Sequence, residues 1–403
     1  MTTTASRPAA VWLFAGGPMQ RRAAEAIRRR GFVLILTDGN DACVLRPLAD
    51  EFVHLNTFGT DENIEKGKEL AERYDIRAVL TAGADCHETV ASVAQSLGLH
   101  GINPAISRLC RFKYETREVL TKAGIPQPRF AVVNTFADAQ AALAGIGLPA
   151  ALKATDNSGS RGFSRIEKAE DLTEEAFELA RSFGTTGKII VEELLIPVEG
   201  EIAEQSVETV WYDGTMTWLN WVDRLFRKDF AFVEHPWRDE EDPYQEISWA
   251  VELAHVNPAV HAEDVRKEVE ALIERAGKAI GMGNEKGGHI LKADIMLTTR
   301  GPMILELTPR LSGGWDSSYS TPARGADVVE GALALALGEP FTDELRTSSF
   351  MCAAKPAFSA VLAQVEPGAR DCIGREFAGG TGDDRGSAIA AAAAALAVGR
   401  FLK

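Results

Sequence analysis

The amino-acid sequence predicts a protein of mixed α/β and α+β class, with a doubly wound parallel sheet at its N-terminal end. Over roughly the first hundred residues, short apolar runs alternate with helix-like runs, the pattern of a parallel sheet covered by helices on both faces. Beyond them, strand-like runs follow one another more directly and include a hairpin near residue 300. The 403 residues, of which 45% are hydrophobic, suffice for roughly two to four domains.

Residues 1–104 are expected to form the parallel-sheet domain. We expect strands at 11–15, 32–37 and 77–80, and helices at 18–30, from Asp61 onward, and at 85–97. The glycine-rich turn that begins at Gly16, together with Asp38 after the second strand, faintly suggests a dinucleotide site. The spacing G-x-G-x-x-G is absent, however, so a doubly wound domain without a dinucleotide is the favoured interpretation.

Residues 105–345 are expected to form a second domain. Its first helix, 105–122, ends in Ala-Gly-Ile-Pro-Gln-Pro, which stops a helix and marks a domain joint. Four strands (129–133, 150–154, 163–166 and 188–194) and the helices between them predict a small, lid-like α+β unit over about 125–192. An aromatic, strand-like stretch at 202–249 and a helix at 262–280 lead into the hairpin. Residues 346–403, with an Ala-rich helix, are expected to form a small C-terminal subdomain.

Composition limits the classes of function. The formal net charge is −15, which argues against a broad nucleic-acid surface or an anionic membrane as partner. The five cysteines are scattered and form no C-x-x-C pair, as expected for reduced thiols in a cytoplasmic protein. No signal peptide is expected before the first strand, and the longest apolar run is too short to span a bilayer. We therefore expect a cytoplasmic protein that acts on small molecules, with any anion site confined to a local basic pocket.

The hairpin near residue 300 contains the most informative acidic pair of the chain. Asp294 interrupts one apolar strand and Glu306 interrupts the next. If Leu297 pairs with Met303 across the turn, the two carboxylates lie directly opposite each other on one face of the hairpin. Two carboxylates so placed repel each other, so the arrangement is costly unless cations lie between them. The pair therefore indicates a metal site.

Two further residues extend this face of the hairpin. Thr308 and Arg310 alternate with Glu306 along the second strand, which adds an oxygen ligand and a cation and gives the layout of a magnesium–phosphate site. The alternative is a surface hairpin with solvated acids, although unpaired carboxylates are expensive within apolar strands. The prediction depends on the register, because a slip of one residue would place the two acids on opposite faces.

Two lysines and a glycine/serine loop predict an anion-binding site. Lys113 lies one helical turn before Arg117, and Lys153 ends an apolar strand. The loop that follows, TDNSGSRG over residues 155–162, can turn successive backbone N–H groups toward phosphate oxygens. The alternative is an ordinary hairpin loop, which often has this composition. The Walker-A pattern G-x-x-x-x-G-K-[ST] occurs nowhere in the sequence, which excludes a P-loop nucleotide site.

A hinge-like segment follows the lid-like unit. The two glutamates after Val191 and the two leucines behind them suggest a hinge at which backbone groups and a carboxylate hold adenine. Glu204, in the run Glu-Gln-Ser-Val-Glu, is placed to bond a ribose. Each signal is weak alone, so the order of the signals along the chain matters more than any one of them.

In this order the motifs resemble the ATP-grasp superfamily. The shared features are a lysine on a helix before A-G-I-P-x-P, a lysine before a Ser/Gly loop, a V-E-E strand, E-x-S-V-E, and an Asp followed by Glu-x-x-x-Arg. The resemblance extends from the first strand to about Pro340. The ending ELTPRLSGG is most similar to the carboxylate–amine ligases related to carbamoyl-phosphate synthase large chains and amino-acid ligases. The resemblance implies an N-terminal doubly wound domain followed by an ATP-grasp fold.

The resemblance also implies ATP and Mg²⁺ as cofactors, and it gives each matching position a role. The residues that would bind the ATP phosphates are Lys113, Lys153, Ser158, Gly159, Ser160, Arg161 and Gly162. Those that would read adenine and ribose are Glu192, Glu193, Leu194, Leu195 and Glu204. One or two Mg²⁺ ions, with Mn²⁺ as an alternative, would be held by Asp294, Glu306 and Thr308. The catalytic residues would be Arg310, Lys153 and Arg161.

One position departs from the family pattern, and several others are candidates for substrate contact. Many family members have Asn where this chain has Thr308, and a hydroxyl is a poorer magnesium ligand than an amide carbonyl. The second metal ion would then be held by Glu306, phosphates and water. By their place in the sequence, the candidates for substrate contact or proton handling are Asp223, Arg224, Glu234, His235, Ser312, Gly313 and Gly314.

The resemblance implies an ADP-forming ligase that activates a carboxylate as an acyl phosphate and couples it to an amine. One alternative is a bicarbonate-using carboxylase, and another is a non-catalytic nucleotide-binding protein that serves regulation. A dehydrogenase ranks behind these. The expected partners are a small-molecule carboxylate and an amine, with no nucleic acid and no membrane. Dimers through the first domain are frequent among similar enzymes, so a homodimer is one expected state.

Overall fold

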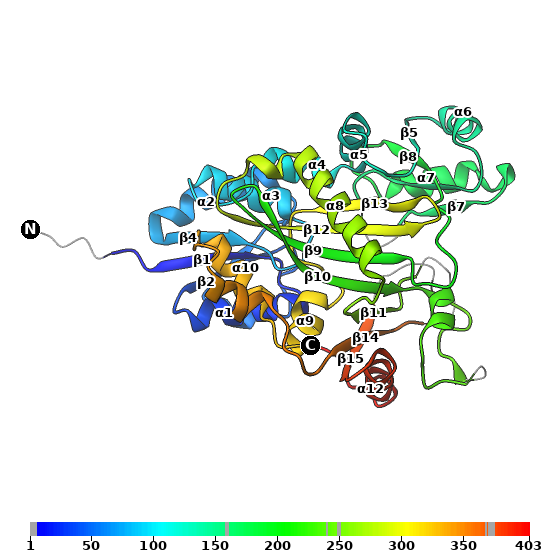
Figure 1. Cartoon of the computed structure of the whole chain (residues 1–403). Coiled ribbons are helices and arrows are strands. Elements are labelled where there is room, and N and C mark those ends of the chain that lie inside the picture. The colour runs from blue at the N-terminus through cyan, green and yellow to red at the C-terminus, as the bar shows by residue number, and fades with distance from the viewer. Residues whose placement is uncertain (1–5, 158–160, 239–240, 248–250, 367–368, 370–374) are drawn as a thin grey trace, which may run out of the picture.

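Three β-sheets organise the part of the chain that the computed structural model describes, which is residues 6–157, 161–238, 241–247, 251–366, 369 and 375–403. Two sheets have four strands, in the orders β3-β2-β1-β4 and β5-β8-β6-β7, and the third has seven, in the order β13-β12-β9-β10-β11-β14-β15. Figure 1 shows the first sheet and its helices on one side of the seven-stranded sheet and the second four-stranded unit above its far end. The mixed α/β and α+β class is confirmed.

The first sheet is parallel, as expected for a doubly wound unit. Its strands are β1 (Ala9–Phe14), β2 (Val33–Asp38), β3 (Glu51–His54) and β4 (Asp75–Leu80). Its helices are α1 (Arg21–Arg29), α2 (Thr60–Arg73) and α3 (His87–Ser96). We did not predict β3, because a four-residue strand with charged ends lacks a clear apolar run.

The expected single helix over 105–122 is wrong, because the chain forms two helices there. They are α4 (Pro104–Arg111) and α5 (Lys113–Lys122), and between them Phe112 adopts an extended backbone with φ −96° and ψ 102°. The backbone N–H of Lys113 donates to the carbonyl of Thr155 at 2.8 Å. The break therefore fixes the start of α5 against the loop that follows Lys153.

The second sheet forms the lid-like α+β unit that the sequence predicts. Its strands are β5 (Phe130–Val133), β6 (Ala150–Ala154), β7 (Ser164–Ile166) and β8 (Ile189–Glu193), and its helices are α6 (Phe136–Ile146) and α7 (Glu174–Ser182). The Thr135 side chain caps α6 by accepting from the Asp138 N–H at 3.1 Å. Buried side chains from both helices, Leu143 and Phe177 among them, pack on one face of this sheet.

The seven-stranded sheet is antiparallel throughout. Its strands are β9 (Glu204–Tyr212), β10 (Thr215–Leu225), β11 (Ala254–Asn257), β12 (Gly288–Thr298), β13 (Gly301–Thr308), β14 (Phe358–Gln364) and β15 (Glu376–Gly382). The helices beside it are α8 (Glu263–Ile280), α9 (Thr321–Ala323), α10 (Val328–Ala336), α11 (Asp343–Leu345) and α12 (Arg385–Ala397).

The C-terminal segment does not stand apart from this sheet as the expected subdomain would. Strand β14 pairs with β11, β15 pairs with β14, and α12 packs on both. Small residues allow the close approach: a Cβ on Gly380 would lie 2.2 Å from the backbone N of Ala392 in α12. The proposed domain boundaries otherwise stay predictions.

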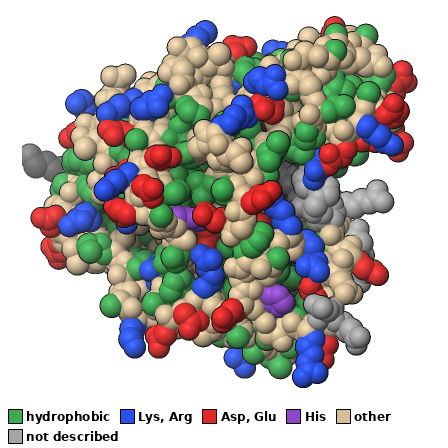
Figure 2. Space-filling model, turned by 45° about the vertical axis from the view of Figure 1, so that its right-hand side comes forward, with side chains coloured by type: hydrophobic (Ala, Val, Ile, Leu, Met, Phe, Trp, Pro, Cys, Tyr) green, Lys and Arg blue, Asp and Glu red, His purple; other side chains and the backbone are tan. Residues whose placement is uncertain are grey.

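The parallel-sheet unit shares its core with the rest of the chain. Ala23 and Ile27 of α1 and Val329 and Leu333 of α10 belong to one buried cluster. Figure 2 shows acidic and basic side chains interspersed across the face in view. Among the described helices, none combines the length and the apolar character needed to cross a membrane.

Candidate functional site

The expected pairing of Asp294 with Glu306 is confirmed, although the register that led to it is wrong. Leu297 pairs with Pro302 rather than with Met303, so a regular ladder would place Leu305 opposite Asp294. The register shifts between Asp294 and Ile295, and this bulge restores the pairing of Asp294 with Glu306. A β-bulge re-aims the side chains that follow it, and here it turns Glu306 toward the face of Asp294.

A buried arginine holds this bulge. Arg117 of α5 is 1% exposed and donates to the carbonyls of Ile304 and Leu305 at 3.1 and 2.8 Å. Its Nε donates to Glu192 Oε1 at 2.7 Å. The planar fork of a guanidinium can satisfy adjacent acceptors in this way. Arg117 therefore links β8 of the lid-like unit to the irregular turn that positions Glu306.

The second oxygen of Glu192 is also occupied, because Lys153 Nζ lies 2.5 Å from Oε2. Burial alone would raise the pKa of Glu192, but the charges of Arg117 and Lys153 lower it to about 2. We expected this carboxylate to read adenine. The structure instead places it between two cations, where it holds the Lys153 ammonium in position.

Two backbone N–H groups of the hinge after β8 already donate hydrogen bonds to backbone carbonyls of the protein. The N–H of Glu193 donates to the carbonyl of Arg129 at 2.9 Å, and the N–H of Leu194 donates to that of Pro149 at 3.0 Å. These two N–H groups, expected to contact adenine, therefore have partners already. Leu195, with a 7% exposed side chain, follows at the edge of the cleft described next.

A cleft between the lid-like unit and the seven-stranded sheet brings most of the predicted residues together. Those that line it are Lys113, Lys153, Arg161, Glu192, Glu193, Leu194, Leu195, Glu204, Arg224, Asp294 and Glu306. Ser158, Gly159 and Ser160 lie outside the described residues. Gly162 has φ +70°, and a Cβ there would lie 3.0 Å from the Phe183 side chain, so this position suits glycine.

The carboxylate of Asp294 is buried among cations, with one oxygen left over. Lys292 Nζ donates to Oδ2 at 2.7 Å, and Arg224 lies 3.2 Å from the same oxygen. Burial alone would raise the pKa of Asp294, but Arg224 and Lys292 lower it. Oδ1 is buried and has no hydrogen-bond partner. A divalent cation fits there, because a carboxylate oxygen without a partner is a good ligand for Mg²⁺.

Glu306, the second candidate ligand, is held from the other side. Lys113 Nζ lies 2.8 Å from Oε1 of Glu306 and donates to the carbonyl of Asn157 at 2.6 Å. Burial favours the neutral carboxyl, yet the Lys113 charge lowers the pKa of Glu306. Thr308 pairs with Lys292 in the ladder, next to the pair of Asp294 and Glu306, and is 4% exposed. No cluster of three or more acidic, His or Cys side chains suited to a metal occurs among the described residues.

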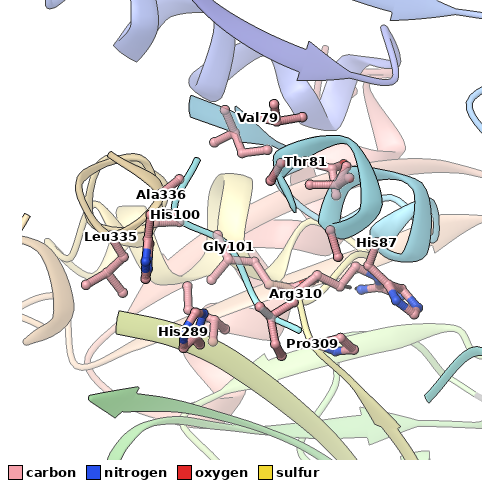
Figure 3. Close-up of a pocket in the computed structure, with 18 of the residues that line it drawn as sticks. Val79, Thr81, His87, His100, Gly101, His289, Pro309, Arg310, Leu335 and Ala336 are labelled. Carbon is pink, nitrogen blue, oxygen red and sulfur yellow. Dashed lines mark hydrogen bonds between the residues drawn. The ribbon is translucent and has the colours of Figure 1, made fainter. Parts of the chain in front are cut away.

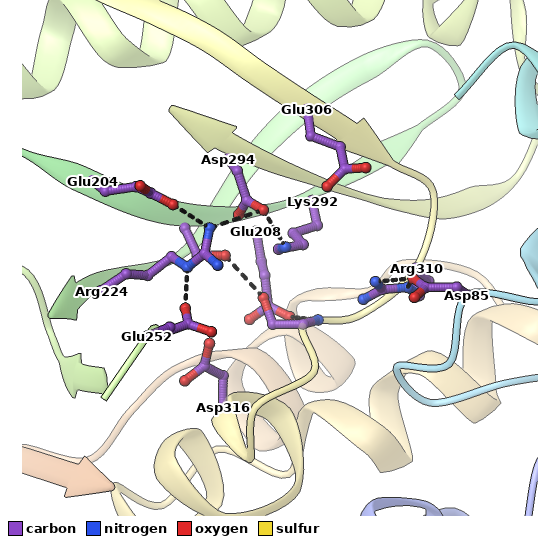
Figure 4. A network of polar contacts seen from close by, with 12 residues as sticks. Asp85, Glu204, Glu208, Arg224, Glu252, Lys292, Asp294, Glu306, Arg310 and Asp316 are labelled. Carbon is purple, nitrogen blue, oxygen red and sulfur yellow. Dashed lines mark hydrogen bonds and ion pairs between the residues drawn. The ribbon is translucent and has the colours of Figure 1, made fainter. Parts of the chain in front are cut away.

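Arg224 lines the cleft and is the centre of a charge network, which Figure 4 shows. It lies 2.8 Å from Glu204, forms an ion pair with Glu252, and approaches Asp294. Burial raises the pKa of Glu204 to about 7, against the attraction of Arg224. Glu204 thus faces the cleft as expected, while Arg224, expected to contact substrate, is engaged with these carboxylates.

A buried histidine continues the network beyond Glu252. His255 Nδ1 lies 2.6 Å from Asp316 Oδ1, and its Nε2 lies 2.9 Å from Glu252. Burial opposes protonation of the ring, but Asp316 and Glu252 raise the pKa of His255 to about 9. The imidazole is therefore an imidazolium at neutral pH and fixes two carboxylates.

A smaller cavity adjoins the cleft on the side of the parallel-sheet unit. The two share Lys113, Asn157, Arg161 and Glu306. The other residues of the smaller cavity are Phe58, Asp85, His87, Cys110, Arg111, Asp156 and Thr308. The parallel-sheet unit thus contributes walls to a continuous site around Glu306.

Arg310 points to this second side rather than to Asp294. Its Nε donates to Asp85 Oδ1 at 3.1 Å, Nη2 forms a second contact with the same oxygen, and Nη1 donates to the carbonyl of Leu311 at 2.8 Å. Figure 4 shows this ion pair apart from Arg224 and its network. Arg310 thus interacts electrostatically with Glu306 and Asp294, while its guanidinium is bound to a carboxylate of the parallel-sheet unit.

Three candidates for substrate contact lie outside both cavities. Asp223 is fully buried, 2.8 Å from Arg385 and 3.2 Å from His261. The ring of His235 lies 5.6 Å from that of Trp237. A Cβ on Gly386 would meet the Glu234 side chain at 2.8 Å. The structure therefore gives these three residues packing or ion-pair partners away from the cleft.

The turn at Ser312, Gly313 and Gly314 also differs from expectation. The N–H of Ser312 donates to Glu208 Oε1 at 2.6 Å instead of facing a substrate carboxylate. Gly313 and Gly314 do not line the cleft or the cavity beside it. Gly314 has φ +62°, and a Cβ there would lie 2.4 Å from the His255 ring. This turn therefore holds the buried network together.

Several residues of the site escaped sequence analysis. Lys292 carried a usable signal, because it interrupts the same apolar strand as Asp294 and lies two residues before it, hence on the same face. Asp85 also carried a usable signal, because it lies in the loop between β4 and α3, and ligands often bind at the carboxyl ends of parallel strands. Glu252 lies only three residues before His255, whereas Asp316 reaches this pair through the tertiary fold, so the three-residue network gives no signal in the sequence.

Comparison with known sequences finds distant relatives. An uncharacterized protein, y4rH, of Sinorhizobium fredii (strain NBRC 101917 / NGR234) is 26% identical over 322 residues, which cover 78% of this chain and 60% of that protein. The alanine–anticapsin ligase of Bacillus subtilis (strain 168) is 24% identical over 263 residues, or 63% of this chain and 52% of the ligase. The chain thus spans about half the length of the curated relatives it matches. No protein-family model matches it.

Solved structures resemble the chain over nearly its whole length. An L-amino acid ligase from Bacillus licheniformis superposes with a TM-score of 0.67 at 18% identity, over 90% of this chain and 82% of the ligase. An N5-carboxyaminoimidazole synthetase from Staphylococcus aureus, complexed with ADP, superposes with a TM-score of 0.65 at 15% identity, over 90% of this chain and 83% of the synthetase. At these identities the likeness establishes the fold, which confirms the expected one.

Proposed function

We propose that this chain, whose fold is that of the ATP-grasp enzymes, is an ADP-forming ligase that joins a carboxylate to an amine. A carboxylate oxygen attacks the γ-phosphorus of ATP, and ADP leaves with the electrons of the broken P–O bond. The amine nitrogen then attacks the acyl phosphate, phosphate leaves, and the nitrogen loses a proton. The observation that carries the proposal is the buried, opposed pair of Asp294 and Glu306, with an unpartnered oxygen on Asp294.

In this proposal ATP occupies the cleft between the lid-like unit and the seven-stranded sheet. Lys153 lies there beside Glu192, and Lys113 lies beside Glu306, so both ammonium groups are held where phosphates need charge. Asp294 and Glu306 would hold Mg²⁺, which neutralises charge on phosphate oxygens, with Thr308 beside them. The proposal includes one or two Mg²⁺ ions, with Mn²⁺ as an alternative metal.

The substrate class we propose is an amino acid. The ligase of B. subtilis is named for alanine and the superposed ligase for L-amino acids. The lining of the cavity beside Glu306 includes charges of both signs, Asp85 and Asp156 as well as Arg111 and Arg161. A zwitterion suits such a site. The 46% exposed ring of Phe58 at this cavity suits an apolar side chain.

A cytoplasmic location and a homodimer are further parts of the proposal. The location follows from the reduced thiols that the cysteine pattern indicates. The homodimer follows from the dimers that are frequent among similar enzymes. Size-exclusion chromatography with light scattering tests the dimer directly.

The activity is tested by measuring phosphate release with Mg·ATP and a panel of amino acids, offered singly and in pairs. We expect release that requires a carboxylate together with an amine, with an amide product in the mass spectrum. Glu306→Gln should lower this turnover by roughly a hundredfold or more, because a metal ligand of the phosphoryl transfer is lost. Glu263→Gln, at a position 70% exposed on α8, is the matched control and should change nothing.

Three outcomes would contradict the proposal. If Glu306→Gln binds ATP and leaves every turnover unchanged, the acidic pair does not carry the reaction. If bicarbonate alone stimulates ATP hydrolysis and no amino acid does, the chain is a carboxylase. ATP binding without ADP release under any combination of substrates would favour a regulatory nucleotide-binding protein.

A further inference from the structure

A separate cavity of about 110 Å³ lies where the parallel-sheet unit meets the seven-stranded sheet. Its walls come from the end of β4, from α3, from residues 100–102, from the start of β12, from residues 309–311 and from α10, as Figure 3 shows. It has no lining residue in common with the cleft between the lid-like unit and the sheet, and it shares only His87 with the cavity beside Glu306. We call it the interdomain cavity.

The wall of the interdomain cavity is apolar with a basic edge. Most of its side chains are aliphatic, among them Val90, Ala91 and Leu335. Its ionisable residues are Arg310, His87, His100 and His289, and it includes no Asp or Glu. Arg310 is the charged group of this wall and is shared with Asp85, so the wall suits a molecule with an apolar body and one negative charge that can share Arg310.

One nitrogen in this wall lacks a partner. His87 is 6% exposed, and its Nδ1 is buried without a hydrogen bond. A buried polar atom left unpaired is destabilising, and a ligand atom bonded to it would remove that cost. His100 and His289 differ in this respect, since their Nε2 atoms contact the carbonyls of Gly288 and Lys286 at 3.1 and 2.9 Å. Their rings stack with centroids 4.8 Å apart and form a flat wall.

We propose that the interdomain cavity is a second ligand site, which binds a small monocarboxylate with an apolar body. The neutral imidazole of His87 donates its Nδ1–H to the carboxylate, and the Arg310 charge attracts it. The aliphatic side chains cover the body of the ligand. Apolar cavities of about 150 Å³ hold a benzene-sized molecule, and this cavity of about 110 Å³ is smaller, so the ligand is a short acid with fewer heavy atoms than benzene.

Arg310 connects this site to the proposed reaction. Its side chain forms part of the interdomain wall, and its guanidinium binds Asp85, which lines the cavity beside Glu306. A carboxylate in the interdomain cavity competes with Asp85 for that guanidinium and thereby changes the charge next to Glu306. The coupling rests on the proposed ligase activity, whereas the binding itself does not.

Binding is tested by calorimetric titration of the full chain with propanoate, after Mg·ADP has saturated the nucleotide cleft. The uncharged propanamide has nearly the same shape and tests the role of the charge. We expect one acid bound per chain, and the amide at least roughly tenfold weaker. Equal binding of acid and amide, or no binding of the acid up to its solubility limit, would overturn the proposal.

Variants test the location. Ala91→Phe on α3 and Ala336→Phe on α10 each fill the interdomain cavity from a different wall, and both should abolish binding of the acid. Ala91 is 2% exposed, whereas Ala336 is only half-buried and tolerates a larger side chain if Ala91→Phe fails to fold. Gln95→Phe, on the exposed side of α3, is the matched control and should bind the acid normally. Binding that survives Ala336→Phe places the ligand elsewhere and removes the proposal. Because the titration measures heat rather than turnover, it reports binding even in a chain that has no ligase activity.

Discussion

At the scale of single residues, the site is a set of buried charges that satisfy one another. Asp294 forms ion pairs with Lys292 and Arg224, and Glu306 forms one with Lys113. Removing one partner of a buried pair leaves an uncompensated charge and is strongly destabilising. These cations therefore keep both acids ionised, and a bound metal ion would share the acids with these side chains.

His255 makes a prediction about pH. Its folded pKa of about 9 lies above the value near 6.5 of an unperturbed histidine, so its contribution to stability is complete below pH 6.5 and is lost as the pH rises through 9. We expect the free energy of unfolding to fall by up to ~3 kcal/mol across that window. Urea unfolding at a series of pH values measures this fall, and His255→Gln should flatten it.

A histidine with the opposite shift provides the control. Burial lowers the pKa of His289 to about 4, so its contribution is lost as the pH falls from 6.5 toward 4. His289→Gln should change the acidic limb of the stability profile and leave the alkaline limb intact. An alkaline limb that persists in His255→Gln would show that another group titrates there.

Some single residues were predictable and others were not. Asp294 and Glu306 could be found because each interrupts an apolar strand, and the same reasoning reaches Lys292. Glu192 was found as a site residue but with a different partner, because sequence does not show that two cations approach it. The network of His255 joins a local partner, Glu252, to a distant one, Asp316, which only the fold brings to it.

At the scale of elements, two irregularities make the site. The extended Phe112 ends α4 and lets α5 start at Lys113, and the bulge at Leu305 turns Glu306 toward Asp294. Hydrophobic periodicity predicts only regular helices and strands. It therefore predicted one helix over 105–122 where the chain forms two, and a hairpin register that is off by one residue. Two such errors cancelled in the hairpin: the assumed register was wrong, and the bulge that corrects it was unforeseen.

The prediction at the scale of elements concerns Arg117, which holds the bulge in β13. Arg117→Lys keeps the positive charge beside Glu192 but cannot donate to the carbonyls of Ile304 and Leu305 at once. We expect the bulge to relax and Glu306 to turn, which should weaken Mg·ADP binding roughly tenfold or more in a calorimetric titration.

The control is a second arginine that bonds a backbone carbonyl. Arg275 of α8 donates to the carbonyl of Gly124 at 3.1 Å from an exposed position, and Arg275→Lys should bind Mg·ADP as the unaltered chain does. Equal affinity in the two variants would mean that the bulge does not depend on Arg117.

At the scale of the whole molecule, the parallel-sheet unit is docked by close backbone contact. Gly83 has φ +121°, and a Cβ there would lie 3.0 Å from the carbonyl oxygen of Ser312. The ion pair of Arg310 with Asp85 lies two residues away. This contact brings Asp85 and Phe58 to the cavity beside Glu306, so docking completes the site.

Gly83→Val should therefore loosen the docked unit. The added side chain is strained by the positive φ and also meets Ser312, whereas Gly31→Val has the same kind of strain at φ +79° with nothing within 4 Å. We expect a lower unfolding temperature for Gly83→Val than for Gly31→Val, and faster proteolysis at the joint near residues 98–104. Matching curves for the two variants would show that the close approach has no energetic role.

The place of β14 and β15 in the large sheet has a consequence for how the chain is made. β11 lies between β10 and β14, so its second edge is covered only by the last fifty or so residues of the sequence. During synthesis the four residues of β11 wait with unpaired N–H and C=O groups until that late segment emerges. A chain truncated before β14 would expose the unpaired edge of β11 to other copies of itself. We therefore expect this truncation to yield aggregates rather than a smaller folded protein.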